Sequence, residues 1–372
     1  MNPQQQFCPN FDCPARGQRG KSNIGIHSLK RRRYICHECG QTFSARQNSV
    51  LYRLHTDPQL VLIVLALLAY GCPIPAVVKV YHLDPRTVRA WWHKAGKHCQ
   101  TFHQRLLERT HLDLGQVQAD EIKIKLQRGV RVWMGLVLRV STRLWLGGAV
   151  DPVRGEDLAR ALANQVRQIA LCRPLLMAVD GWQAYLGAFR RAFRDRLPRD
   201  RATGRSVLRE WPELAIVQVI KPHTLGETIQ RRMIQGTARV VQDLISRSQG
   251  GGQINTAYIE RLNASFRQRL AALARQTRHL AQLTESVAAG MWVVGCVYNF
   301  CDPQQSLRLQ LSVGEHGYHW VERTPALASG LADHVWSVEE LLATPVPPPR
   351  WKPQFGRGRP SNQLREQIRK WA

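Results

Sequence analysis

The sequence predicts a multidomain α/β protein, in which a small cysteine module and a helical segment precede a larger domain with a mixed β-sheet. Three observations lead to this prediction. Four cysteines gather near the start of the chain, a helical pattern covers residues 51–110, and short apolar runs then alternate with amphipathic ones. With 372 residues, of which 44% are hydrophobic, the chain can form two to three domains with their own cores.

The charge of the chain is strongly unbalanced and indicates a polyanionic partner. Lys and Arg number 53 against 27 Asp and Glu, which gives a formal net charge of +26. Nucleic acid is the leading candidate, and an anionic membrane surface is the rival. The longest apolar run, 60–70, is too short to span a bilayer, and the first residues do not resemble a secretory signal. We therefore expect a cytoplasmic, nucleoid-associated protein without a membrane partner.

Residues 1–50 are expected to form a zinc finger. The four ligands would come in two pairs, C-x4-C and C-x2-C, namely Cys8, Cys13, Cys36 and Cys39. Two short turns that each deliver a pair of thiolates suit tetrahedral Zn²⁺, and a module this small needs the metal to fold. The alternative is a chance grouping of cysteines without metal. Between the pairs the chain is basic and free of acids, so we expect phosphate contacts from Arg31, Arg32 and Arg33.

Residues 51–110 have the pattern of a helix-turn-helix DNA-binding domain. A first helix over 75–81 is followed by a tight turn, and Asp84 and Pro85 are typical of the start of a second helix. Three polar side chains in the first turns of that helix would face DNA: Arg86, Thr87 and Arg89. An ordinary helical hairpin is the alternative for this stretch.

Residues 111–302 are predicted to form the sheet domain. QVQADEIKIKL, RVWMGLVLRV and RLWLGGAV read as three antiparallel strands. RGEDLARALANQVRQIA and QAYLGAFRRAFRDRL read as helices, and PLLMAVDGW and ELAIVQVIK read as further strands. We expect a loop over 198–212, a helical excursion over 224–247, and an insertion into the domain over about 196–255.

Three acids in this domain are candidate ligands of a divalent cation. Asp120 lies on the apolar face of its strand, Asp180 ends an apolar strand, and Glu260 begins a helix that carries a long arginine-rich run. The adjacent Glu121 alternates with lysines, and we interpret it as a solvated residue. Carboxylates from separate elements suit hard cations such as Mg²⁺. Taken singly, each acid could equally be a cap, a salt bridge or a turn residue.

The end of the chain is expected to be irregular. Residues 303–345 read as a short hairpin and helix, and residues 346–372 shift to proline, glycine and basic residues. The composition predicts a linker or arm that is disordered without a partner. Within it, GRGRP resembles an AT-hook, whose Arg357 and Arg359 would lie in the minor groove; an unstructured basic linker is the alternative.

The motifs ADE, VDGW and NTAYIERLN, with the following FRQRLAALARQTR, resemble those of the DDE transposases, and most closely the bacterial insertion-sequence-one group. The likeness covers roughly residues 5–302. It implies a ribonuclease H-like catalytic domain in which Asp120, Asp180 and Glu260 bind Mg²⁺ or Mn²⁺. It further implies DNA contacts from Arg267 and Arg269 in the basic run, and a role for Asn263 in orienting either DNA or Glu260.

Two functions follow as hypotheses. The first is a DNA transposase that binds the terminal inverted repeats of its element, hydrolyses a phosphodiester and transfers the freed 3′-OH into target DNA. Joining two ends requires a homodimer or a larger homo-oligomer. The second is a non-catalytic or domesticated sequence-specific DNA-binding regulator. Other enzyme classes are not indicated, because the sequence holds no G-x-x-x-x-G-K-[ST], H-E-x-x-H or G-x-S-x-G motif.

Overall fold

The computed structural model describes residues 1–107, 110–197, 206–221, 228–274, 277–313, 317–353 and 359–371. The chain divides into two compact units, and both chain ends belong to the first. That unit comprises Met1–Leu62 with Glu339–Ala372, and the second comprises Ile63–Val338. Within the described ranges, none of the helices has the length and apolar character needed to cross a membrane.

The first unit is built around a small antiparallel sheet. Its strands are β1 (Ile24–Ser28), β2 (Arg33–Cys36) and β3 (Thr42–Ser44), in that order. Tyr34 pairs with Phe43 across β2 and β3, and their rings stack with centroids 5.7 Å apart. These two aromatic residues join the buried cysteines in one core.

The C-terminal segment folds onto this sheet, which corrects the expectation of a disordered arm for its described residues. It contains α11 (Asn362–Trp371), whose last residue, Trp371, is 2% exposed and packs in the same core as the cysteines. The side-chain amide of Gln18 donates to the carbonyl of Trp371 at 2.8 Å. Of the GRGRP residues, Arg359 is exposed, whereas Arg357 lies outside the described residues.

The second unit carries a six-stranded mixed sheet, in the order β11-β10-β7-β4-β5-β6. Its strands are β4 (Gln116–Lys125), β5 (Arg131–Arg139), β6 (Trp145–Asp151), β7 (Leu175–Val179), β10 (Leu214–Ile220) and β11 (Gln230–Gln235). The predicted antiparallel start is confirmed, because β4, β5 and β6 pair antiparallel, while β7 runs parallel to both β4 and β10. This agrees with the predicted mixed α/β class.

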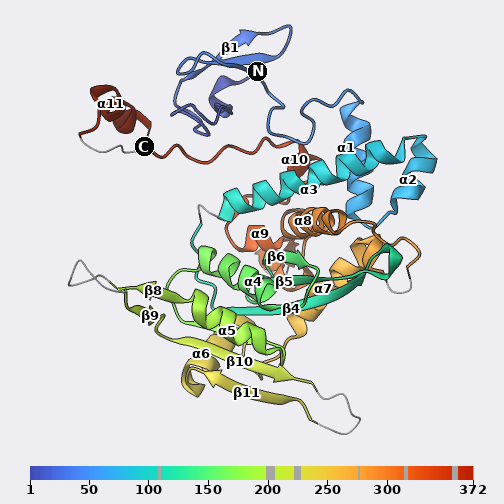
Figure 1. The fold of residues 1–372 in the computed structure, drawn as a ribbon, viewed down its shortest axis with the longest axis vertical. Helices are drawn as coiled ribbons and strands as arrows, with labels where there is room; N and C mark the ends of the chain where they lie inside the picture. The colour runs from blue at the N-terminus through green and yellow to red at the C-terminus, as the bar shows by residue number, and fades with distance from the viewer. Residues whose placement is uncertain are drawn as a thin grey trace. The chain divides into compact units, whose positions relative to one another are not determined.

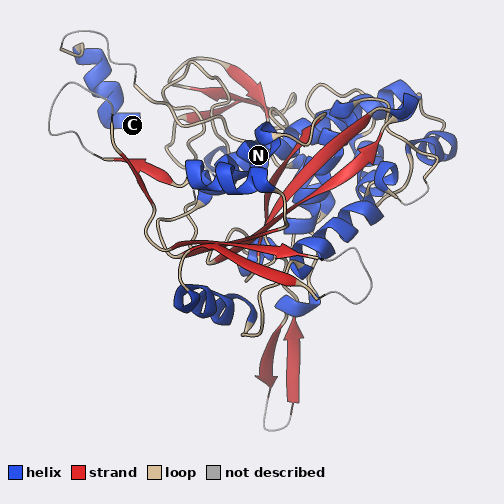
Figure 2. Cartoon of the chain, turned by 60° about the horizontal axis from the view of Figure 1, so that its bottom comes forward, coloured by secondary structure: helices blue, strands red, loops and turns tan. Residues whose placement is uncertain are grey.

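Helices cover both faces of this sheet (Figures 1 and 2). One face packs against α4 (Glu156–Ile169) and α5 (Gln183–Ala192). The other packs against α6 (Ala238–Gln249), α7 (Ala257–Arg269) and α8 (Thr284–Phe300). The remaining helices are α1 (Pro58–Ala69), α2 (Ile74–Tyr81), α3 (Pro85–Leu107), α9 (Pro325–Ala328) and α10 (Val338–Ala343). A hairpin of β12 (Leu309–Val313) and β13 (Gly317–Val321) precedes α9, as the sequence predicts.

Two expectations between residues 183 and 249 were wrong in part. The predicted helix over 183–197 ends at Ala192, and the chain enters β8 (Arg194–Arg196), which pairs with β9 (Leu208–Glu210) inside the expected loop. The segment 224–247 was expected to be helical, yet it contributes β11 before α6 begins. β11 is polar and exposed, so it has no apolar period to reveal it; it forms because the open edge of β10 supplies hydrogen-bond partners.

Candidate functional site

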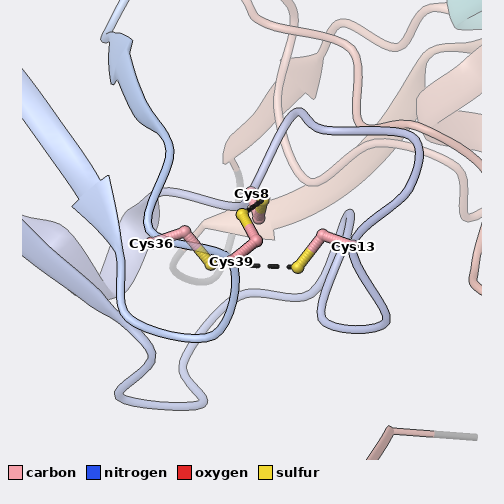
Figure 3. A group of neighbouring side chains, drawn as sticks. All are labelled: Cys8, Cys13, Cys36 and Cys39. Carbon is pink, nitrogen blue, oxygen red and sulfur yellow. Dashed lines mark hydrogen bonds between the residues drawn. The ribbon is translucent and has the colours of Figure 1, made fainter.

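The four predicted zinc ligands converge in the first unit (Figure 3). The Sγ atoms of Cys8 and Cys39 lie 3.7 Å apart, and those of Cys13 and Cys36 lie 3.9 Å apart. A tetrahedron with Zn–S bonds of about 2.3 Å has edges of roughly 3.8 Å, so this spacing fits Zn²⁺. The four-cysteine group could therefore hold zinc as a structural site closed by thiolates.

The packed thiols titrate unequally. Hydrogen bonds that Cys8 donates to Cys13 and Cys36 raise the pKa of Cys8, whereas hydrogen bonds that Cys36 accepts from Cys13 and Cys8 lower the pKa of Cys36. The side-chain amide of Asn23 also points to the Sγ of Cys36, at 3.7 Å. A donor aimed at a sulfur in this way is typical of the groups that orient metal thiolates.

The basic residues of the finger are placed in two different ways. Arg31 and Arg32 are exposed in the turn between β1 and β2, where a phosphate could approach them. The guanidinium of Arg33 instead bonds within the unit, donating to the carbonyl and the hydroxyl of Thr42 at 3.0 and 2.7 Å.

The two helices that were predicted after residue 74 are present in the second unit as α2 and α3. His82 ends α2 in the left-handed conformation, and Asp84 Oδ1 accepts the backbone N–H groups of Arg86 and Thr87 at 2.7 and 3.1 Å. This is the N-cap geometry that the sequence predicts. Arg86, Thr87 and Arg89 are exposed, whereas the apolar residues of the same turns are buried: Val88, Trp91 and Trp92.

Asp120, in the middle of β4, and Asp180, directly after the carboxyl end of β7, come together on adjacent parallel strands. Ala119 of β4 pairs with Val179 of β7, so the two aspartates follow in the same register. Asp180 is fixed by the backbone N–H of Trp182, which donates to its Oδ1 at 2.9 Å. Sequence reasoning predicted both placements, from the apolar alternation around Asp120 and from the strand that Asp180 ends.

Glu260 faces the same cleft from the first turn of α7. The cleft has a volume of about 660 Å³, and its lining includes Asp120, Asp180 and Glu260. The start of α7 is pinned by Gln118, a buried residue of β4 whose side chain donates to the carbonyl of Asn255 at 2.6 Å and accepts the N–H of Ile259 at 2.9 Å. Gln118 was not predicted as a functional residue, although its place on the apolar face with Asp120 was a signal.

Glu121 was interpreted from its lysine neighbours as solvated, and this was wrong. Its side chain is 2% exposed, accepts a hydrogen bond from the hydroxyl of Tyr185 at 2.8 Å and pairs with Arg154. One oxygen each of Asp120, Glu121 and Asp180 lies within 4.8 Å of the others. Glu260 is not part of this group; it pairs with Lys221 across the cleft.

The charges of this cleft favour a bound cation. Burial, with the nearby charges of Asp180 and Glu260, raises the pKa of Asp120 to about 6. Burial and the charge of Asp180 raise the pKa of Glu121 to about 7. Burial acts in the same direction on Glu260, but hydrogen bonds from Lys221 and Thr256 outweigh it and lower its pKa.

A cation bound among crowded carboxylates favours their ionised form, because it offsets the repulsion between their negative charges. Two side-chain cations, Arg154 and Lys221, already lie against these acids. Carboxylate oxygens are the ligands that hard divalent cations prefer, so this acidic group could bind Mg²⁺ or Mn²⁺.

The predicted DNA contacts on α7 have different surroundings. Asn263 is 2% exposed, and its side-chain amide donates to Asp120 Oδ2 at 2.7 Å, so it orients the acid. Arg267 is exposed, and its charge lies close enough to Asp120 to oppose the rise in pKa. Arg269 is occupied within the unit, because it pairs with Asp302 and lies over the ring of Tyr70.

Comparison with known proteins adds no family assignment to this geometry. The chain matches no protein-family model and no curated protein. The functional conclusion therefore depends on the residues of the two candidate metal sites and on the basic elements described above.

Proposed function

We propose that the protein is a DNA transposase with a ribonuclease H-like catalytic domain, which cleaves and joins DNA phosphodiesters with divalent cations. One observation carries the proposal. Asp120 of β4 and Asp180, which follows the end of the adjacent β7, lie side by side, and Glu260 faces them across one cleft from a helix that continues into arginines. This arrangement agrees with the element order and the acid triad that the resemblance to DDE transposases implies.

The chemistry needs hard cations at these acids. Mg²⁺ or Mn²⁺ bound there would activate the attacking water or 3′-OH and stabilise the leaving oxygen. The protein residues hold the site in shape: Asn263 orients Asp120, the N–H of Trp182 orients Asp180, and Gln118 fixes the start of α7. Hydrogen bonds from neighbouring groups to metal ligands keep those ligands in a single orientation and increase their affinity for metal.

Basic elements of both units support DNA as the substrate. The exposed Arg86 and Arg89 lie in the first turns of α3, and Arg267 is exposed about two turns beyond Glu260 on α7. Arginines at the start of a recognition helix read base edges or phosphates, and a cation beside the acids draws the backbone to the reacting centre. The zinc finger, with Arg31 and Arg32 exposed, would add a further DNA contact.

One observation favours the second candidate, a DNA-binding regulator without catalysis. Glu260 pairs with Lys221 and lies outside the group formed by Asp120, Glu121 and Asp180. If this ion pair persisted in the DNA complex, the third acid would not reach a cation held by the first two. The two candidates therefore differ in whether DNA is cleaved, not in whether it is bound.

The test compares DNA cleavage in three proteins. Duplex DNA carrying the sequences that flank the gene would be incubated with the wild type, Asp120→Asn and Asp157→Asn, in Mg²⁺, Ca²⁺ or EDTA. Asp157 is a matched control, since its side chain is 80% exposed on α4 and away from the cleft. We expect nicking in Mg²⁺ by the wild type and Asp157→Asn alone. Binding of DNA without nicking by any of the three would support the regulator.

A further inference from the structure

Arg154 lies at the edge of the acidic cleft and is held by aromatic rings. It belongs to the connection between β6 and α4, and it lines the cleft beside Asp180. Its guanidinium carbon is 4.8 Å from the ring centroid of Trp182 and 5.3 Å from that of Trp133. Contacts with two aromatic faces limit the directions in which the guanidinium can point, and each adds a favourable cation–π interaction.

The same guanidinium is bound to two acids through one nitrogen. Its Nη2 pairs with Glu121 and donates to Asp180 Oδ2 at 3.1 Å. Glu121 is in turn fixed from behind by the hydroxyl of Tyr185, which is fully buried in α5. The guanidinium of Arg154 is thus held by Glu121 and by the two tryptophan rings, and Tyr185 fixes Glu121.

Glu121 is poorly placed to serve the cleft directly. Its side chain is 2% exposed and does not belong to the lining, whereas Asp120, Asp180 and Arg154 all do. A carboxylate that is already paired with an arginine and a tyrosine hydroxyl has less capacity left for a cation. The remaining function of such an acid is to hold its partner.

Arg154 keeps donors that the acids do not use. A guanidinium has five N–H groups in a rigid plane, and the contacts to Glu121 and Asp180 both come from Nη2. Its side chain is 34% exposed, toward the cleft that it lines. The Nε of Arg154 is buried without a hydrogen-bond partner among the described residues, so the donors left for the cleft are the N–H groups of Nη1, from which a phosphate could accept a charge-assisted hydrogen bond.

We propose that Arg154 binds a phosphate of the substrate strand next to the acids, and that Glu121 is its positioning residue and not a metal ligand. The inference rests on the proposed function, since it assumes that a nucleic-acid strand enters this cleft. It gives a role to Arg154 and Glu121, which lie beside the triad of Asp120, Asp180 and Glu260 but are not part of it.

The experiment separates cation binding from DNA binding in the full-length protein. Variants Arg154→Gln, Arg154→Lys and Glu121→Gln would be compared with Asp120→Asn and with Arg160→Gln. Arg160 is the matched control, an arginine of α4 whose side chain is 56% exposed. Mn²⁺ affinity would be measured by electron paramagnetic resonance without DNA. Affinity for duplex DNA would be measured by fluorescence anisotropy in Ca²⁺, and cleavage in Mg²⁺.

The proposal predicts a distinct result for each residue. Arg154→Gln should weaken DNA binding by about tenfold or more, as expected for one charge-assisted contact, and should not weaken Mn²⁺ binding. Arg154→Lys should recover only part of the loss, because an ammonium keeps the charge but cannot bind both acids and a phosphate from one rigid plane. Glu121→Gln should weaken DNA binding less than Arg154→Gln and leave Mn²⁺ affinity within about twofold of the wild type. Asp120→Asn should lose Mn²⁺ binding.

Two results would overturn the proposal. DNA affinity of Arg154→Gln equal to that of Arg160→Gln would remove the phosphate role. Loss of Mn²⁺ binding in Glu121→Gln to the extent seen in Asp120→Asn would make Glu121 a ligand. If Glu121→Gln failed to fold, Tyr185→Phe would replace it, since this variant removes only the hydroxyl that holds Glu121. A wild type that binds Mn²⁺ and DNA without cleaving would refute the transposase, while the binding measurements would still decide the role of Arg154.

Discussion

Trp371, the last residue of α11, is expected to stabilise the four-cysteine module, which could hold zinc, at the opposite end of the chain. It is 2% exposed and packs with Cys8, Cys13 and Cys36 in the core of the first unit. Truncating a buried tryptophan to alanine costs about 3–5 kcal/mol. We expect the lower end of this range, because the indole Nε1 is buried without a hydrogen-bond partner among the described residues.

The magnitude predicts a large effect on zinc retention. A loss of about 3 kcal/mol shifts the folding equilibrium of the first unit roughly a hundredfold toward opening, at about 1.4 kcal/mol for each factor of ten. Since three of the four cysteines, Cys8, Cys13 and Cys36, are buried in the folded unit, zinc bound there should escape mainly through open states. Trp371→Ala should therefore release zinc roughly a hundredfold faster to an excess of a chromophoric chelator.

Trp320→Ala is the matched control for this measurement. Trp320 is a tryptophan of β13 in the second unit and is 43% exposed. Its truncation should leave zinc release near the wild-type rate. Equal release rates in Trp371→Ala and Trp320→Ala would contradict this prediction, because the C-terminal helix would then contribute nothing to the stability of the four-cysteine module.

Three further predictions concern the second unit. Without metal, the pKa values of Asp120 and Glu121 are raised from 3.8 and 4.5 to about 6 and about 7, so the folded state keeps protons that the unfolded state has lost. Their contribution to the free energy of unfolding should be full below about pH 4 and should fall as the pH rises to about 7. The stability that Mg²⁺ adds should grow over the same pH range. Thermal unfolding at pH 5 and pH 8, with and without Mg²⁺, checks both expectations, and an equal Mg²⁺ effect at the two pH values would contradict the second. Replacing Arg86 and Arg89 together with alanine should reduce the slope of log affinity against log salt by about 2, without affecting Mn²⁺ binding, if both contact phosphates; an unchanged slope would remove them from the interface. Asn263→Ala removes the 2.7 Å hydrogen bond to Asp120 and should weaken Mn²⁺ binding about tenfold or more with DNA binding retained, which a Mn²⁺ titration and a gel shift would check.

The parts of the fold that follow from local pattern were predicted from the sequence. Strict alternation placed Asp120 with Ile122 and Ile124 on a buried face, and the apolar run before Asp180 predicted a buried strand. Likewise, Asp84 and Pro85 marked the beginning of α3 because N-cap chemistry depends only on adjacent residues.

Where the surroundings of a residue were predicted wrongly, the cause is in part a contact with residues that are distant in the sequence. Glu121 looked solvated between polar neighbours, but Tyr185 and Arg154 close over it from α5 and from the connection after β6. The pattern of apolar and polar residues near Glu121 cannot predict a contact with residues this distant in the sequence. The C-terminal helix is a different case, because Leu364, Ile368 and Trp371 recur at helical spacing and were obscured by the proline-rich composition before them.

The central claim is that Glu260 completes a catalytic site that joins DNA, and strand transfer tests it most directly. A duplex with free 3′-OH ends from the sequences flanking the gene would be incubated with supercoiled plasmid and Mg²⁺. Wild type would be compared with Glu260→Gln and with Glu285→Gln, an exposed glutamate in the first turn of α8. The account predicts joined products with the wild type and Glu285→Gln, and bound but unjoined DNA with Glu260→Gln. Joining by Glu260→Gln at the wild-type rate would contradict it.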